Sequence, residues 1–359
     1  LNLGIILRDL GNLQEAELST LKAIELQPEY AKSHYNLGLI LRDLGKLKEA
    51  ELSQRKAIEL NPNYAIAHSN LGNILRNLGE LNEAESSLKK AIQINPNFAE
   101  AYCNLGSVLK DIGKLEEAKI STSKAINIRP DYTMAYYNLG DILRDLSEFK
   151  EAEILTRKAI KLQPKFANAY NNLGLILKDI GNLEEAKLSI EKAIEFNPNC
   201  AIAYSNLGNI LLEMGKFYDA IDSYKKSLKY DINLSNSKWG VITSKGNICD
   251  WSYQDKQDKW IKNLGIIGSS VIPLGLFYYE DNPIKQLQRA KNLYKEKYYK
   301  ESKYIANFKN EKIHIGYFSA DFKDHPVMHL ISSILELHDK SRFNIYLYSF
   351  VEKEDEYTE

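Results

Sequence analysis

Residues 65–96 read AIAHSNLGNILRNLGELNEAESSLKKAIQINP, and variants of this stretch follow one another along the first 234 residues. The glycine of its Asn-Leu-Gly tripeptide recurs every 34 residues, at Gly4, Gly38, Gly72, Gly106, Gly140, Gly174 and Gly208. A fixed step of this size indicates stacked supersecondary units, because one such unit cannot bury its apolar face alone.

Each unit predicts two short amphipathic helices, since apolar residues recur at helical spacing in both of its halves. Gly79 is expected to end the first helix, because glycine readily adopts a positive φ. Pro96 is expected to close the second helix, because proline cannot continue one. This pattern resembles the tetratricopeptide repeat. Seven copies, the first incomplete, would fill residues 1–234.

Two copies depart from the pattern. Ser147 takes the place of the turn glycine in the fifth copy. Asp231 and Ile232 stand where the last copy would have its proline, so we expect the array to end there. His34 and His68 occupy a position that later copies fill with tyrosine, and they are expected to be packing residues.

An asparagine holds the same phase of every first helix: Asn2, Asn36, Asn70, Asn104, Asn138, Asn172 and Asn206. Asparagine is a mediocre helix former, so seven asparagines in the middle of helices need an explanation. The amides could line the concave groove of the array and hold the backbone of an extended peptide, at about 0.5–1.5 kcal/mol for each hydrogen bond. Alternatively, each amide could bond the neighbouring repeat and only shape the stack.

The segment 235–310 loses the period, and we expect a mainly helical bridge containing all three tryptophans, Trp239, Trp251 and Trp260, in a local core. Asn282 and Pro283 predict a helix start, with the helix running over about 284–303. This helix is rich in lysine and tyrosine, which could suit nucleic acid. We favour a solvated basic face whose tyrosines pack inward, and we do not expect nucleic acid as a partner.

Residues 311–359 alternate a strand at 312–319, a helix that starts at Pro326, and a strand at 343–349. This order predicts a βαβ unit that opens a parallel sheet. The loop after the first strand holds Asp321, Asp324 and His325. Ligands of open α/β sheets bind beyond the carboxyl ends of the strands, so this loop is a candidate site. His325 could serve acid–base chemistry or a phosphate contact, or could only cap the helix, and His329 could share the pocket.

Composition narrows the remaining possibilities. A formal net charge of −1 gives no electrostatic reason to expect nucleic acid or an anionic membrane. Cys103, Cys200 and Cys249 form no CxxC pair, which argues against a zinc site or a disulfide framework and fits a cytoplasmic protein. No apolar run approaches the roughly 18 residues of a membrane helix. No GxGxxG follows the strand at 312–319, and GxxxxGK[ST] occurs nowhere in the sequence. Neither signature therefore supports a dinucleotide or ATP site.

A wider resemblance joins three blocks in order: the repeats, Cys249-Asp250-Trp251, and Ile315 to Phe322 with His325-Pro326 and His329-Leu330. Together they resemble the O-GlcNAc transferase/SPINDLY family. The resemblance implies an α-helical solenoid (an α-α superhelix) followed by the beginning of an α/β Rossmann-like GT-B domain, of which 311–359 would be the first βαβ unit. Burial is the expected role of the Cys249 triplet.

This resemblance also implies an activity, the transfer of a sugar to Ser or Thr of proteins without a metal ion or other cofactor. The donor would be UDP-N-acetylglucosamine, with GDP-fucose as the alternative. A non-catalytic repeat adaptor is the alternative of a different class. His325 matches the family's active-site histidine, and Asp321 and His329 are further catalytic candidates. The family's asparagine-lined superhelix favours peptide binding by Asn36, Asn70, Asn104, Asn138, Asn172 and Asn206.

The expected partners are therefore a protein or peptide substrate in the repeat groove and a nucleotide sugar, with no membrane. The 359 residues break off in a charged stretch and do not begin with Met, so we expect a fragment of a longer protein. The nucleotide-binding half of the transferase would lie beyond Glu359, and this fragment is expected to be inactive alone.

Overall fold

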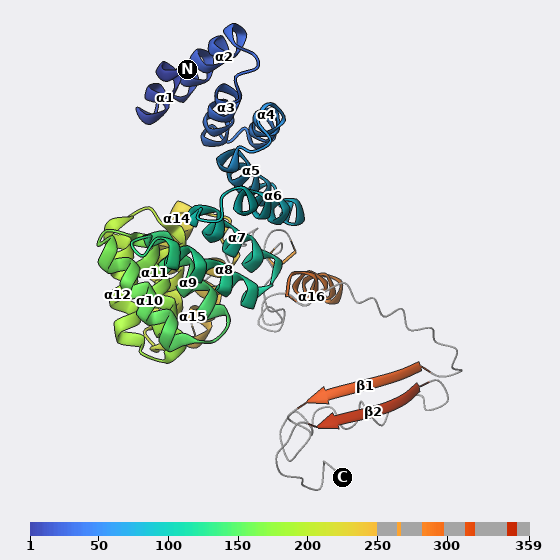
Figure 1. The fold of residues 1–359 in the computed structure, drawn as a ribbon. Helices are drawn as coiled ribbons and strands as arrows, with labels where there is room; N and C mark the ends of the chain where they lie inside the picture. The colour runs from blue at the N-terminus through green and yellow to red at the C-terminus, as the bar shows by residue number, and fades with distance from the viewer. Residues whose placement is uncertain (250–263, 267–281, 298–312, 320–342, 350–359) are drawn as a thin grey trace. The chain divides into compact units, whose positions relative to one another are not determined.

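The computed structural model describes residues 1–249, 264–266, 282–297, 313–319 and 343–349. The chain divides into two compact units, Leu1–Lys297 and Tyr298–Glu359. Figure 1 shows the paired helices of the first unit following one another along the chain.

Two helices form each repeat, as the periodicity predicts. The first helices are α1 (Asn2–Asp9), α3 (Ala31–Asp43), α5 (Ala65–Asn77), α7 (Ala99–Ile112), α9 (Thr133–Asp145), α11 (Ala167–Ile180) and α13 (Ala201–Glu213). The second helices are α2 (Leu13–Leu26), α4 (Leu47–Leu60), α6 (Leu81–Ile94), α8 (Leu115–Ile128), α10 (Phe149–Leu162), α12 (Leu183–Phe196) and α14 (Phe217–Tyr230). Each second helix contacts both its partner and the first helix of the next repeat, so the predicted helical solenoid is confirmed.

Small residues let the two helices of a repeat approach closely. A Cβ atom added at Gly72 on α5 would lie only 2.6 Å from Cγ of Leu88 on α6. Leu88, Ala84 and Ala91 are fully buried, so the tripeptide glycine is a contact surface for the second helix. The apolar core is continuous from repeat to repeat, because Leu88 clusters with Leu105 of the following first helix.

The turn between the helices of a repeat requires a left-handed residue. Gly79 takes it with φ +82°, and Ser147 takes the same place with φ +62°. A non-glycine residue in this region is strained by its Cβ atom.

Ser147→Gly is therefore expected to raise the free energy of unfolding by about 1 kcal/mol, since glycine relieves that strain. The matched control is Gly79→Ser, which is expected to lower the free energy of unfolding by a similar amount through the same strain. No clash adds to this cost, because nothing lies within 4 Å of a Cβ atom there. Urea unfolding followed by circular dichroism measures both. A lower stability for Ser147→Gly would contradict the strain.

One further helix stacks on the seventh repeat, beyond the expected end of the array at Asp231 and Ile232. Helix α15 (Ser235–Asn247) contacts α14 and α13, as a first helix contacts the repeat before it. Tyr224 is fully buried between Gly208 and Gly240, and its hydroxyl donates to Oδ1 of Asn209 at 2.8 Å. Trp239 is half-buried on α15, whereas Trp251 and Trp260 lie outside the described residues.

Helix α16 (Pro283–Lys297) begins where the sequence predicts, because Oδ1 of Asn282 accepts from the Lys285 backbone N–H at 3.1 Å. Arg289 is fully buried, and its Nε donates to the Leu264 carbonyl at 2.8 Å. The expectation that the tyrosines pack inward is wrong for Tyr294, whose side chain is exposed. Residues 298–303 of the predicted helix lie outside the described part of the chain.

The second unit contains strands β1 (Ile313–Ser319) and β2 (Phe343–Ser349). They pair in parallel, with Ile313 opposite Phe343 and Ser319 opposite Ser349. Both predicted strands and their parallel direction are confirmed. A parallel pair needs a crossover connection, and the predicted helix at Pro326 falls in the connection that lies outside the described residues.

Candidate functional site

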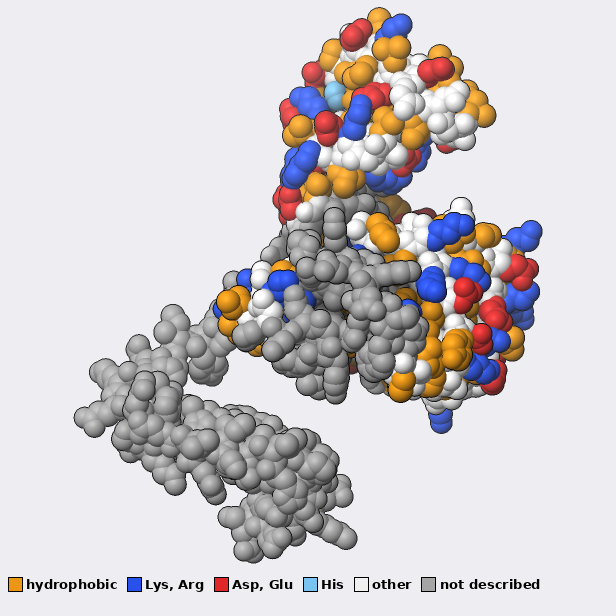
Figure 2. All heavy atoms as spheres, turned by 180° about the vertical axis from the view of Figure 1, so that it is seen from behind, with side chains coloured by type: hydrophobic (Ala, Val, Ile, Leu, Met, Phe, Trp, Pro, Cys, Tyr) orange, Lys and Arg blue, Asp and Glu red, His pale blue; other side chains and the backbone are white. Residues whose placement is uncertain are grey.

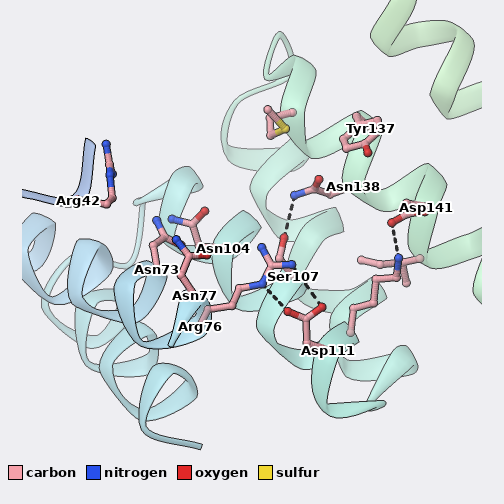
Figure 3. Close-up of a pocket in the computed structure, with 13 residues that line it drawn as sticks. Arg42, Asn73, Arg76, Asn77, Asn104, Ser107, Asp111, Tyr137, Asn138 and Asp141 are labelled. Carbon is pink, nitrogen blue, oxygen red and sulfur yellow. Dashed lines mark hydrogen bonds and ion pairs between the residues drawn. The ribbon is translucent and has the colours of Figure 1, made fainter. Parts of the chain in front are cut away.

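A groove-like cavity of about 530 Å³ lies on the first helices of the second to fifth repeats. Its walls come from α3, α5, α7 and α9, and its lining is mostly polar: Arg42, Asn73, Arg76, Asn77, Asn104, Ser107, Lys110, Asp111, Met134, Tyr137, Asn138, Asp141 and Ile142. Figure 3 shows Arg42, Asn73 and Asn77 toward one side and Asn138 with Asp141 toward the other. We call this surface the first-helix groove.

Two of the predicted peptide-binding asparagines line the groove, and both donate to the preceding repeat. Nδ2 of Asn104 donates to Oγ of Ser69 at 3.3 Å. Nδ2 of Asn138 donates to Oγ of Ser107 at 3.0 Å and to Sγ of Cys103 at 3.2 Å. Within the described part of the chain, Oδ1 of Asn104 and Oδ1 of Asn138 accept no hydrogen bond. Each amide thus helps to shape the stack through its nitrogen and keeps its oxygen as an acceptor.

The other asparagines of the series do not line this groove. Asn36 and Asn172 are buried, at 8% and 3% exposed. Nδ2 of Asn36 donates to the Lys32 carbonyl within its own helix at 2.7 Å. Asn70 and Asn206 are half-buried, and Nδ2 of Asn206 donates to Oδ1 of Asn171 in the preceding repeat at 2.9 Å. Peptide binding by the series remains a prediction, and Asn104 and Asn138 are its members that line the groove.

A row of ion pairs joins successive repeats, and Arg76, Lys110 and Asp111 of this row line the groove. In five of the seven repeats, a basic residue near the end of the first helix meets an acidic residue 35 positions later: Arg8–Asp43 at 2.6 Å, Arg76–Asp111 at 2.5 Å, Lys110–Asp145 at 3.2 Å, Arg144–Asp179 at 2.6 Å and Lys178–Glu213 at 3.4 Å. We call this the cross-repeat ion-pair row. Its partly exposed pairs each contribute little to stability, about 0–1 kcal/mol, but the Arg76–Asp111 pair holds two of the charges in the groove.

Lys110 is the most enclosed cation of the groove. It pairs with Asp141 as well as with Asp145. Burial lowers the pKa of Lys110, but its hydrogen bond to Asp141 and the charges of both aspartates outweigh burial and raise the pKa above its usual value. Lys110 is therefore a fixed positive charge, and with its two carboxylates it forms a cluster of net charge −1.

Cys103 lies beneath Asn138 and is fully buried. Burial is the main cause that raises the pKa of its thiol to about 11, against the opposing hydrogen bond from Asn138. A neutral, enclosed thiol is a packing group rather than a nucleophile. Cys249 is exposed, so the expected burial of the Cys249-Asp250-Trp251 triplet is wrong for its cysteine.

The histidines of the repeats take part in turns. Nε2 of His34 is bonded to the Pro28 carbonyl at 2.7 Å, and Nε2 of His68 to the Pro62 carbonyl at 3.0 Å. The Tyr136 hydroxyl makes the equivalent bond to Pro130 at 3.1 Å. This shared contact shows that histidine and tyrosine can do the same work at this position. Among the described residues, no group of three or more His, Cys, Asp or Glu side chains could hold a metal ion.

The predicted catalytic candidates Asp321, His325 and His329 lie outside the described residues. The structure does describe strand β1, which directly precedes their segment in the chain. Because β1 and β2 are parallel and in register, their carboxyl ends at Ser319 and Ser349 are neighbours. The chain that leads to His325 therefore starts at the edge where open α/β sheets bind ligands.

The charged lining of the groove was not singled out from the sequence. The available signal was the same 34-residue period, since the basic and acidic residues of the ion-pair row recur with it. On the face drawn in Figure 2, charges of both signs lie among apolar side chains over the described repeats. No helix in the described part of the chain combines the length and apolar character needed to cross a membrane.

Comparison with protein families separates the two parts of the chain. Tetratricopeptide repeat models match residues 1–30, 20–51, 38–79, 72–113, 99–132, 135–166, 167–200 and 201–233. The glycosyl transferase family 41 model matches residues 285–358, which include most of α16, both strands and the segment with Asp321, His325 and His329. No curated protein matches the chain.

Solved structures share the repeat fold. A tetratricopeptide repeat protein from Parabacteroides merdae is 22% identical, with 68% of this chain and 96% of that chain covered and a TM-score of 0.57. PilF of Pseudomonas aeruginosa is 18% identical, with 59% and 96% covered and a TM-score of 0.51. A chain of the APC/C hetero-tetramer Cut9-Hcn1 is 16% identical, with 81% and 54% covered and a TM-score of 0.57. At these identities the likeness concerns the fold alone.

The repeat models together span most of residues 1–233, and the helix pairs stack as those models require. The chain belongs to the tetratricopeptide repeat proteins and carries, at residues 285–358, a segment that matches glycosyl transferase family 41.

Proposed function

We propose that this chain is part of a protein O-glycosyltransferase, in which the first-helix groove binds the protein substrate and the segment after the repeats belongs to the catalytic domain. The observation that carries the proposal is the match to glycosyl transferase family 41 at residues 285–358, in the same chain as a polar groove on tetratricopeptide repeats. The catalytic domain would have the Rossmann-like GT-B fold, and the parallel pair of β1 and β2 supports this.

The reaction proposed is transfer of N-acetylglucosamine from UDP-N-acetylglucosamine to a Ser or Thr hydroxyl, without a metal ion. As the hydroxyl oxygen bonds to the anomeric carbon, its proton must leave and the bond to the diphosphate must break. A histidine can take such a proton near neutral pH. We propose His325 for this role, with Asp321 and His329 in the same pocket. The absence of any CxxC cysteine pair suits a cytoplasmic protein, which we also propose.

The groove would hold an extended segment of the acceptor protein through its backbone. Oδ1 of Asn104 and Oδ1 of Asn138 are acceptors for two peptide N–H groups, because their own nitrogens are already bonded within the stack. Backbone contacts of this kind do not depend on the side chains of the acceptor. They would let one groove accept many sequences, with the choice of serine or threonine made at the catalytic domain.

The Asn104→Ala, Asn138→Ala double variant is expected to bind acceptor peptides about tenfold more weakly, since two net hydrogen bonds of about 0.5–1.5 kcal/mol each are lost. Fluorescence anisotropy with labelled peptides measures the affinity, and circular dichroism checks the helices. The matched control is Asn206→Ala, because Nδ2 of Asn206 also donates to the preceding repeat but Asn206 does not line this groove. Equal weakening by both changes would indicate that the amides act only through the stack.

The proposed activity is tested on the longer protein that carries these residues. It is mixed with acceptor proteins and either UDP-N-acetylglucosamine or GDP-fucose, and intact-mass spectrometry follows the acceptors. An added N-acetylhexosamine supports the proposal, and an added deoxyhexose replaces the donor with GDP-fucose. Acceptors that bind but gain no mass with either donor would contradict the transferase and favour an adaptor.

A further inference from the structure

The cross-repeat ion-pair row has one gap, and it falls in the first-helix groove. The residue 35 positions after Arg42 is Asn77, where the other repeats place an aspartate or glutamate. An amide carries no charge, so Arg42 cannot form the ion pair that Arg76 forms with Asp111 one repeat later. Both Arg42 and Asn77 line the groove.

Arg42 turns instead to a carboxylate that is already shared. Its Nη2 and Nε donate to Oδ1 of Asp43 at 2.8 and 3.1 Å. Oδ2 of the same aspartate accepts from Nε of Arg8 at 2.6 Å. Two guanidinium groups thus share one carboxylate, which leaves a net positive charge at this end of the groove. The pKa of Asp43 is consistent with two arginines on one carboxylate. Burial raises this pKa, but the bonds from both arginines outweigh burial and lower the pKa below its usual value.

The geometry also leaves donors unused at the gap. Among the described residues, Nη1 of Arg42 and Nδ2 of Asn77 donate no hydrogen bond, and about 28% of the Arg42 side chain is exposed. A carboxylate accepts from two donors at once and gains most from a guanidinium. Asn77 is exposed and lines the same groove, so an incoming group does not have to displace a packed side chain.

We propose that the gap at Arg42 and Asn77 is a subsite for an acidic side chain, glutamate or aspartate, of the peptide bound in the groove. The bound carboxylate takes the place that an acidic residue of the chain fills in the other repeats. This inference rests on the proposed function of the groove as a peptide site. It adds a side-chain preference to a surface that otherwise contacts only the peptide backbone.

The test uses the whole chain and two pools of labelled dodecapeptides, identical except that one contains a single glutamate at random positions and the other glutamine. The native chain is expected to bind the glutamate pool about 3- to 10-fold more tightly, as for a charge-assisted bond at a partly exposed site. Asn77→Asp is expected to abolish this preference, because the introduced carboxylate completes the pair with Arg42. Asp111→Asn, which opens the equivalent gap at Arg76, is expected to keep or increase it.

The outcomes separate the inference from the proposed function. Equal affinity of the native chain for both pools, or an unchanged preference in Asn77→Asp, would overturn the subsite and leave the peptide groove standing. If neither pool binds, the groove is not a peptide site and the subsite falls with it. Circular dichroism is expected to show native helix content in both variants, because each changes one partly exposed side chain.

Discussion

Replacing His325 by alanine in the longer protein is expected to lower the rate of sugar transfer by about 10²- to 10⁴-fold, the usual contribution of a general base. The physical reason is the position of its segment. β1 and β2 are parallel, so their carboxyl ends are neighbours. The segment that contains His325 follows Ser319, at the carboxyl end of β1. A base at this edge of an α/β sheet can reach a ligand bound beyond the strands. Initial rates with the donor that transfers are the measurement.

The control for His325→Ala is the affinity of acceptor peptides for the repeats, which is expected to stay unchanged because the groove lies on α3 to α9. His329→Ala serves as a neighbouring histidine change with a smaller expected effect. Unchanged turnover in His325→Ala would remove this residue from the chemistry. A loss of peptide affinity together with turnover would mean that the change disturbs the repeats rather than the reaction.

Gly72→Val is expected to lower the free energy of unfolding by about 3 kcal/mol, at the upper end of the usual cost of overpacking a core. The valine Cβ atom would begin 2.6 Å from Cγ of the fully buried Leu88, so Leu88 or one of the two helices must shift. Repeat arrays lose stability locally, through the repeat and its neighbours. Urea unfolding measured by circular dichroism gives the change.

Two further variants separate overpacking from other effects at Gly72. The Gly72→Val, Leu88→Ala double variant is expected to be more stable than the sum of the single changes, because valine partly fills the space that leucine leaves. Asn73→Val on the same helix is the matched control, since Asn73 faces the groove and not the second helix. A cost at Asn73 equal to the cost at Gly72 would show that valine destabilises the helix itself, not its contact with Leu88.

Most of the repeat fold could be predicted because its determinants are local and repeated. Gly79 and Pro96 end helices through backbone properties that hold in any context. The same local logic placed the start of α16 at Asn282. Exposure of single side chains was less predictable: Tyr294 and Cys249 are exposed where burial was expected. Their exposure depends on what packs around them in three dimensions, which periodicity does not encode.

The candidate site could be predicted only in part, because its contacts join different repeats. The asparagine series was visible, but the choice between peptide binding and stack shaping could not be made from residue types. In the structure, Asn138 shapes the stack through its nitrogen and keeps its oxygen as an acceptor. The gap at Arg42 and Asn77 becomes meaningful only when residues 35 apart are seen as ion-pair partners in the neighbouring repeats.

The central claim, that the acceptor protein lies in the first-helix groove, is tested most directly by photo-cross-linking in the longer protein. A benzophenone amino acid replaces Met134, which is 43% exposed in the groove, or Ile120, which is 70% exposed on the second helix α8. An acceptor protein is expected to cross-link from position 134 and not from position 120. Cross-links from position 120 alone, or equally from both, would contradict it.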